Sequence, residues 1–155
     1  MIIGSAKKEQ AEQISRLLGY ICEFHAKGRP DIFVPGSAKY DAESVCRLID
    51  DPGVTVITAA EGGAVLGYLI AKVTFTGTDP HIKRMKTFYI DDLCVSPEHA
   101  RTGVGTALFN EARRLAKEQG CDRIDLNVWS FNEGAIRFYE KMGLSVYRMH
   151  MEELL

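Results

Sequence analysis

The stretch at residues 93–108, LCVSPEHARTGVGTAL, decides the fold of this chain. It joins an apolar strand to an amphipathic helix through a turn that contains Gly103 and Gly105. The first amides of a helix have no partner within the helix, and the helix dipole makes this end attractive to anions. The stretch therefore predicts a phosphate-binding turn between a strand and a helix.

A second segment, residues 132–144, NEGAIRFYEKMGL, predicts another helix. Asn132 is a favourable N-cap, and Gly143 is the residue type that commonly follows the end of a helix. The helix between them carries Phe138 and Tyr139 on its apolar side.

The first turn also matches the start of the dinucleotide-binding pattern G-x-G-x-x-G, counted from Gly103. Leu108 stands where the third glycine of that pattern would let helix and strand pack closely. In addition, residues 96–102 separate the strand from the turn, whereas this connection is tight in dinucleotide-binding proteins. Both differences argue against NAD binding.

Hydrophobic periodicity predicts the order β-α-α-β-β-β-α-β-α-β, which is typical of an α/β or α+β protein with a mixed sheet. The expected strands cover residues 2–4, 54–60, 64–75, 87–95, 124–128 and 144–151. The expected helices follow Ser5, cover residues 42–49, begin at Val104 and begin after Asn132. Residues 28–36 and 76–86 form the longest polar connections.

Length and charge limit the classes of function. The chain has 155 residues, 46% of them hydrophobic, which is enough for one core and short for two. We therefore expect a single domain over residues 1–155. A net charge of -2, from 19 basic and 21 acidic residues, provides no overall field for nucleic acid or an anionic membrane.

The cysteines and histidines do not suggest a metal site. The four cysteines are widely separated without a C-x-x-C pair, and the four histidines lack ligand spacing. The sequence shows neither a signal peptide nor a long apolar span. These features predict a soluble cytoplasmic protein with reduced thiols and no bound metal.

Together, residues 93–108 and 132–144 closely resemble the two signature segments of the GNAT superfamily, the acyl-CoA-dependent N-acyltransferases. The resemblance implies a single GNAT-like domain of the α/β (α+β) class, with a central mixed, mostly antiparallel sheet and helices on both faces. It also implies that the fourth and fifth strands splay apart, and that the pantetheine arm of CoA lies in the gap.

The resemblance further implies that the turn binds the pyrophosphate of acetyl-CoA. The family pattern Arg/Gln-x-x-Gly-x-Gly/Ala falls on residues 100–105, where Ala100 replaces the usual Arg or Gln. Because backbone amides are the donors, we expect binding to survive this change, with Arg101 supplying charge. The implied cofactor-binding residues are Leu93, Cys94, Val95, Arg101, Thr102, Gly103, Val104, Gly105, Thr106 and Asn132.

Transfer from a thioester needs an acid for the departing thiolate and an acceptor for the amine proton. Tyr139 corresponds to the family tyrosine that donates to the CoA sulfur, although a core aromatic would fit the same position. Several family members carry a glutamate where this chain has Tyr89. Strand alternation predicts that Asp91 shares a face with Tyr89 and Leu93, whereas Asp92 points the other way. Asp91, acting through water, is the expected proton acceptor, with Asp92 or water alone as alternatives.

The resemblance thus implies an N-acetyltransferase that transfers an acetyl group from acetyl-CoA directly to a primary amine in a ternary complex. Arg29, Asp31, Tyr40 and the loop at residues 76–86 are expected to border the amine, whose identity stays open. The resemblance also allows a homodimer. The alternative is a non-catalytic acyl-CoA-binding sensor or assembly module, which Ala100 favours and Tyr139 disfavours.

Overall fold

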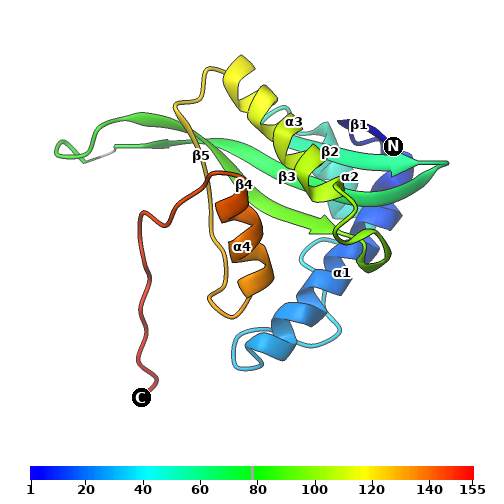
Figure 1. Cartoon of the computed structure of the whole chain (residues 1–155), viewed down its shortest axis with the longest axis horizontal. Helices are drawn as coiled ribbons and strands as arrows, with labels where there is room; N and C mark the ends of the chain where they lie inside the picture. Colours follow the sequence, from blue (N-terminus) through cyan, green and yellow to red (C-terminus); the bar gives the residue numbers. More distant parts are fainter. Residues whose placement is uncertain (78) are drawn as a thin grey trace.

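The structure, a computed structural model, describes residues 1–77 and 79–155. Its elements follow the predicted order up to the last helix (Figure 1). The strands are β1 (Ile2–Ser5), β2 (Val54–Glu61), β3 (Ala64–Thr76), β4 (Met85–Val95) and β5 (Arg123–Leu126). The helices are η1 (Lys8–Gln10), α1 (Ala11–Gly28), α2 (Ala42–Asp50), η2 (Pro97–His99), α3 (Val104–Glu118) and α4 (Glu133–Lys141).

The strands form one mixed sheet in the order β1-β2-β3-β4-β5. Neighbours from β1 to β4 are antiparallel, and β5 joins β4 in parallel. Pairing between β4 and β5 ends at Ile90 and Leu126, although β4 continues to Val95. This confirms the predicted mixed, mostly antiparallel sheet with splayed fourth and fifth strands.

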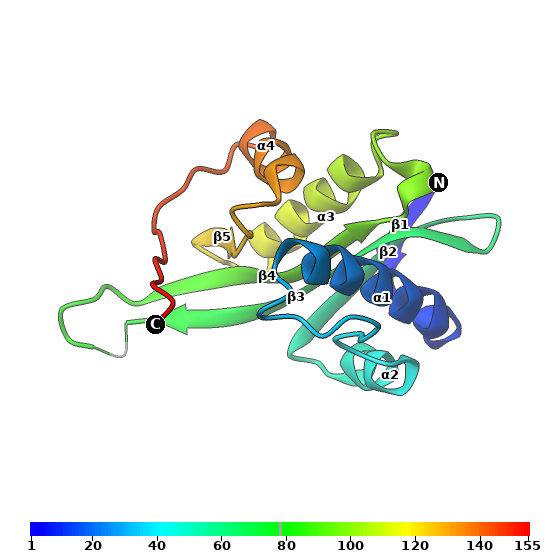
Figure 2. The same cartoon turned by 90° about the horizontal axis from the view of Figure 1, so that it is seen from below.

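Helices cover both faces of the sheet, as predicted (Figure 2). On one face, α3 contributes Leu108 and Phe109, which are fully buried against β2, β3 and β4. On the other face, α1 and α2 bury Ile14, Leu18 and Val45. Each such side chain contributes about 1.5–3 kcal/mol through burial, so the two helical layers hold the sheet from both sides.

A β-bulge in β4 changes the predicted arrangement of side chains. Ile70 pairs with Asp92 and Ala71 with Ile90, so Asp91 has no partner in β3. An extra residue of this kind interrupts the two-residue alternation of a strand. Asp91 and Asp92 therefore both lie on the α1 face, whereas Leu93 packs against the α3 face. The prediction that Asp91 shares a face with Leu93, opposite Asp92, is wrong for this reason.

The predicted strand at residues 144–151 is also wrong. This segment has no regular secondary structure, and it leaves the body of the protein after α4 (Figure 1). It contacts β5 through side chains: the Tyr147 hydroxyl lies 3.5 Å from Asp125 Oδ2, and Arg123 lies over the Tyr147 ring. An alternating pattern gives a strand only where a neighbouring edge takes up the backbone hydrogen bonds.

The loop predicted at residues 76–86 is shorter, because β3 and β4 extend into it from both sides. The resulting hairpin projects beyond the helical layers (Figure 1). Within it, Thr78 lies outside the described residues. No helix in the described ranges is long and apolar enough to cross a membrane.

Candidate active site

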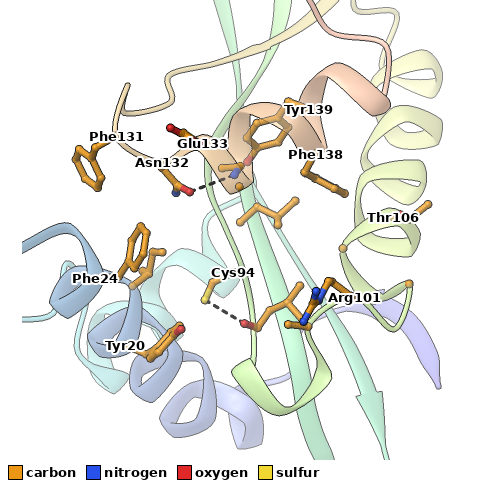
Figure 3. A pocket seen from close by; sticks show the side chains of 18 residues that line it. Tyr20, Phe24, Cys94, Arg101, Thr106, Phe131, Asn132, Glu133, Phe138 and Tyr139 are labelled. Atoms are coloured by element: carbon orange, nitrogen blue, oxygen red, sulfur yellow. Dashed lines mark hydrogen bonds between the residues drawn. The ribbon is translucent and has the colours of Figure 1, made fainter. Parts of the chain in front are cut away.

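A cleft of about 690 Å³, the larger cleft, lies between α1, the end of β4, the start of α3 and α4 (Figure 3). Tyr20 and Phe24 of α1 face Phe138 and Tyr139 of α4 across it. The predicted site residues that line it are Leu93, Cys94, Val95, Arg101, Gly103, Gly105, Thr106, Asn132 and Tyr139. Two distant segments of sequence thus meet at one cleft.

The start of α3 presents its amides to this cleft. Its N-cap is Gly103, with a φ of 93°, and none of the described side chains caps this end. Arg101 also has a positive φ, of 63°, which turns the chain sharply before the helix. Uncapped amides at a helix N-terminus, beside an arginine, form a favourable site for a phosphate group. The start of α3 can therefore accept an anionic group.

The side chains of Thr102 and Val104 do not line the cleft. The Thr102 hydroxyl donates to the His99 carbonyl at 2.7 Å, which helps to close the turn. Val104 is buried in the core, where a Cβ on Gly67 would come within 3.2 Å of it. Val104 can therefore serve a ligand only through its backbone amide, whereas the Thr102 amide already donates to the His99 carbonyl at 3.4 Å.

The end of β4 supplies a strand segment without a partner on the β5 side. Its Cys94 is buried, and burial, with the nearby charge of Asp92, raises the pKa of the thiol to about 12. The thiol is therefore neutral at physiological pH and donates to the Val95 carbonyl at 3.7 Å. A thiol that stays protonated is a poor nucleophile, so Cys94 lines the cleft as a small apolar side chain.

Tyr139 occupies the wall of the larger cleft on α4. Desolvation, and then the charge of Asp92, raises the pKa of its hydroxyl above the ordinary value. Its ring packs against Phe138 and Phe109, with centroids 5.2 and 6.3 Å away. Among the described residues, none forms a hydrogen bond with the hydroxyl. The Tyr139 hydroxyl therefore keeps its proton and is able to donate it to a ligand.

A second cavity of about 510 Å³, the smaller cavity, adjoins the larger cleft. The residues that line both are Ile21, Leu93, Asn132, Ala135 and Tyr139. The smaller cavity also carries Tyr89, Asp91 and Asp92 from β4 and Lys39 from the segment before α2. Tyr139 therefore stands at the junction between a phosphate-binding cleft and a cavity with two carboxylates.

The two carboxylates have different environments. Asp91 Oδ2 lies 2.6 Å from Lys39 Nζ and accepts a hydrogen bond from the Tyr40 hydroxyl at 3.4 Å. Asp92 Oδ1 accepts from the buried Tyr68 hydroxyl at 3.0 Å. Desolvation raises the pKa of Asp92, although the Tyr68 hydrogen bond and Lys39 oppose this shift. Asp91 is thus the ion-paired carboxylate, and Asp92 is the desolvated carboxylate that accepts from a neutral donor.

An aromatic cluster that the sequence did not predict spans the mouths of both cavities. Phe24 and Phe131 belong to the larger cleft, whereas His25, Phe33 and Trp129 belong to the smaller cavity. Neighbouring rings lie 5.1 to 6.4 Å apart between centroids. The signal for it was weak: aromatic residues gather in residues 129–131 and at the end of α1, with no periodicity linking them.

The predicted borders of the amine site are only partly observed. Tyr40 reaches Asp91, whereas Arg29 forms ion pairs with Asp31 and Glu152. Of the loop at residues 76–86, no described residue lines either cavity. Lys86, at its end, donates from Nζ to the Gln119 carbonyl, which holds it beside α3. The described part of this loop therefore lies away from the two cavities.

No group of His, Cys, Asp and Glu side chains within residues 1–77 and 79–155 is placed to hold a metal ion.

The N-acetyltransferase fold is defined by three features that this structure combines. They are an open mixed sheet with separated fourth and fifth strands, an uncapped helix start and a tyrosine at the gap. The sequence model of the acetyltransferase (GNAT) family matches residues 16–144. The chain belongs to this family.

Individual relatives are distant in sequence. The uncharacterized N-acetyltransferase MJ1207 of Methanocaldococcus jannaschii is 36% identical over 63 residues, which are 41% of this chain and 28% of that protein. The thialysine N-epsilon-acetyltransferase of Mus musculus is 26% identical over 102 residues, 64% of this chain and 52% of that protein. The chain thus matches about half or less of the length of these two relatives.

One solved structure has nearly the same fold as this chain. A mutant of the BH1408 protein of Bacillus halodurans superimposes with a TM-score of 0.95, at 28% identity. The comparison covers 100% of this chain and 99% of that chain. The whole arrangement of elements, including the C-terminal segment, therefore has a close counterpart.

Proposed function

We propose that residues 1–155 form one N-acetyltransferase domain, which transfers an acetyl group from acetyl-CoA to a primary amine. The observation that carries the proposal is the junction of the two cavities at Leu93 and Tyr139. Because the cavities meet there, an acyl donor and an amine can be bound at the same time. Transfer is then direct, within a ternary complex, and needs no covalent enzyme intermediate.

The larger cleft would hold acetyl-CoA. The amides of residues 103–106, with the Arg101 guanidinium, would bind the pyrophosphate. The free side of Leu93, Cys94 and Val95 would pair with the pantetheine amides, as an added peptide strand pairs with a sheet edge. Asn132 accepts from the Ala135 amide through Oδ1, so its side-chain nitrogen can donate to the same arm.

The residues at the junction would accept the amine protons and protonate the thiolate. The amine enters as an ammonium ion and gives one proton through water to Asp91, after which its nitrogen bonds to the acetyl carbonyl carbon. The carbon–sulfur bond breaks, and Tyr139 protonates the departing thiolate. Tyr139 regains its proton from the second nitrogen hydrogen through water. The products are the amide, CoA and one proton.

Replacement of Tyr139 by Phe tests this function. The change keeps the ring packing and removes the acid, so turnover should fall by about a hundredfold, the scale of acid–base catalysis. Affinity for CoA, measured by titration calorimetry, should stay within about twofold of wild type. The contacts that bind CoA equally well before and during the reaction are not changed. Tyr147→Phe, which removes a hydroxyl from the exposed C-terminal segment, is the matched control. Unchanged turnover in Tyr139→Phe would reduce Tyr139 to a packing residue.

The acceptor should be a primary amine on an aliphatic stem. The smaller cavity offers two carboxylates to an ammonium ion and aromatic faces to the stem and charge. The mouse relative is named for the N-epsilon position of thialysine, an amine of this kind. A panel of free basic amino acids, diamines and lysine peptides, followed by thiol release from acetyl-CoA, would rank the candidates.

The alternative function is a non-catalytic acyl-CoA-binding module. Ala100 and Tyr89 depart from the family pattern and favour it. A pure binder, however, needs neither an acid at the junction nor a second cavity with carboxylates. Thiol release that depends on an added amine would exclude the alternative, and CoA binding without any release would support it.

We also propose a cytoplasmic homodimer. The four cysteines are free thiols, which suits a reducing compartment. Segment 144–155 exposes Val146, Tyr147, Met149, Met151, Leu154 and Leu155 to solvent. β5 lies at the end of the sheet, so within residues 1–77 and 79–155 no strand pairs with its outer edge. The same segment of a second copy can cover that edge.

A further inference from the structure

Lys39 occupies the position that an acceptor amine would take. Its Nζ lies 2.6 Å from Asp91 Oδ2 inside the smaller cavity. The side chain remains 38% exposed, whereas that of Asp91 is 17% exposed, so the lysine reaches inward from the cavity mouth. A primary amine on a four-carbon stem is thus already bound at the proposed proton acceptor.

The backbone directly after Lys39 is held by two hydrogen bonds. The Ser15 hydroxyl of α1 donates to the Tyr40 carbonyl at 3.2 Å. Asp41 caps α2 by accepting from the Ser44 amide at 2.8 Å. The ammonium also lies 5.4 Å from the centroid of the Tyr40 ring. Since its neighbours anchor the chain to α1 and α2, Lys39 has a restricted reach, centred on Asp91.

We propose that Lys39 is a site of self-acetylation, at which the enzyme modifies its own acceptor cavity. The inference rests on the proposed function, because acetyl-CoA in the larger cleft is the donor. Lys39 gives one proton to Asp91, and its neutral nitrogen bonds to the acetyl carbonyl carbon as the carbon–sulfur bond breaks. Tyr139 protonates the thiolate and regains a proton from the nitrogen through water. The products are acetylated Lys39, CoA and one proton.

Two opposing effects, protonation of Lys39 and its proximity to the acetyl donor, decide the rate of self-acetylation. Burial lowers the pKa of Lys39, but the hydrogen bond and charge of Asp91 outweigh it, so the pKa is raised. Each unit of this shift reduces the neutral amine about tenfold at pH 7. Groups held in a reactive geometry gain effective concentrations of about 10⁵ M or more, which exceeds such a loss by orders of magnitude. Self-acetylation of Lys39 therefore depends on proximity outweighing protonation.

Acetyl-CoA with a deuterated acetyl group provides the test, with peptide mass spectrometry of the full chain over time. Lys117, exposed on α3, measures uncatalysed acetylation in the same sample. We expect Lys39 to be labelled at least about tenfold faster than Lys117, at a rate independent of protein concentration. Tyr139→Phe should slow labelling of Lys39 and leave Lys117 unchanged.

Equal labelling of the two lysines, or labelling of Lys39 that Tyr139→Phe leaves intact, would overturn the inference. Lys39→Arg keeps the cation and should remove the fast-labelled site from the intact-protein mass. CoA binding and turnover of an added amine are measured on the same preparation. Turnover without labelling of Lys39 rejects self-acetylation and retains the proposed function. Absence of both CoA binding and turnover rejects the proposed function and the inference with it.

Discussion

Asp91 and Asp92 are adjacent and face the same cavity, but they have different hydrogen-bond partners. Asp91 has an ammonium partner in Lys39. Asp92 has a neutral donor in Tyr68, and the charge of Asp91 adds to the desolvation that raises its pKa. The folded protein therefore holds a proton on Asp92 more tightly than the unfolded chain does. Its ionised carboxylate costs stability above the raised pKa, and this cost disappears below the ordinary value of 3.8.

Asp92→Asn should consequently stabilise the fold at pH 7. The amide oxygen can still accept from Tyr68, while the desolvated charge is removed. Each unit of the pKa shift corresponds to about 1.4 kcal/mol of unfolding free energy. The difference from wild type should shrink as the pH falls through the raised pKa toward 3.8. Urea unfolding between pH 3 and pH 8, about the range over which a carboxyl group titrates, measures this dependence.

Asp79→Asn serves as the control for that series, since it removes an exposed carboxylate. It should leave the unfolding free energy within about 0.5 kcal/mol of wild type. A loss of stability in Asp92→Asn at pH 7 would mean that the charged form of Asp92 is favoured in the fold.

Some residue positions could be predicted from local sequence alone. Gly103, Asn132 and Tyr139 all line the larger cleft, and a turn or a cap fixes each of them relative to its own helix. The face of Asp91 could not be predicted in this way. It depends on the bulge opposite Ile70 and Ala71, and these residues belong to another strand.

At the scale of elements, the start of α3 approaches α4 and the end of β4 around Gly105. A Cβ on Gly105 would lie 3.4 Å from the Phe138 ring and 3.6 Å from Val95, which are ordinary contact distances or nearly so. A methyl group is thus tolerated at this position. A longer, charged side chain would enter the space in front of the uncapped amides.

Gly105→Glu should therefore weaken CoA binding, and Gly105→Ala should preserve it. The glutamate adds bulk and a negative charge where phosphates would bind, and a like charge close by costs several kcal/mol, or about a hundredfold or more in affinity. Titration calorimetry with CoA gives the comparison, and circular dichroism verifies that both variants fold. Equal affinities for CoA would remove this turn from the donor site.

The end of α1 meets the β5–α4 connection through Gly28 and Phe131. A Cβ on Gly28 would come within 2.3 Å of the Phe131 ring, so the ring must move if the glycine is replaced. Gly19, in the middle of the same helix, has open space around it. The two glycines form a matched pair on one element.

Gly28→Ala should disturb the larger cleft, while Gly19→Ala should only stabilise the helix. Gly19→Ala should raise the unfolding free energy by about 0.5–1 kcal/mol, because alanine has less backbone freedom to lose. Gly28→Ala should raise the Michaelis constant for acetyl-CoA about tenfold or less. The Phe131 ring in the wall of the larger cleft is displaced, but no hydrogen-bond donor to the ligand is lost. Steady-state kinetics and urea unfolding separate the two effects. Identical kinetics in both variants would show that Phe131 is not part of the donor wall.

Helices and hairpins were predicted well because their signals are local. The apolar stripe of α3 and the turn between β2 and β3 each lie within a few residues of what they specify. Strand ends that depend on distant partners were less accurate. β5 ends at Leu126, two residues before the prediction, because its pairing with β4 stops there.

For the whole molecule, the C-terminal segment is the part whose sequence and conformation disagree. Residues 144–151 have the apolar content of a strand, yet Met149 and Met151 are 79% and 87% exposed. A strand pattern beside an unpaired sheet edge is a template for pairing between chains. If two copies exchange these segments symmetrically, each edge and each apolar segment becomes covered.

The full chain should therefore be a dimer by light scattering coupled to gel filtration, and a variant that lacks residues 146–155 should be a monomer. The truncation removes the exchanged segment and leaves all the described helices and strands, so circular dichroism should be nearly unchanged. The double variant Tyr147→Glu, Met149→Glu should also be monomeric, because charges oppose pairing at an edge. A monomeric full chain whose residues 144–151 show slow amide hydrogen exchange would indicate pairing within one chain instead. A dimer that survives both changes would place the interface elsewhere.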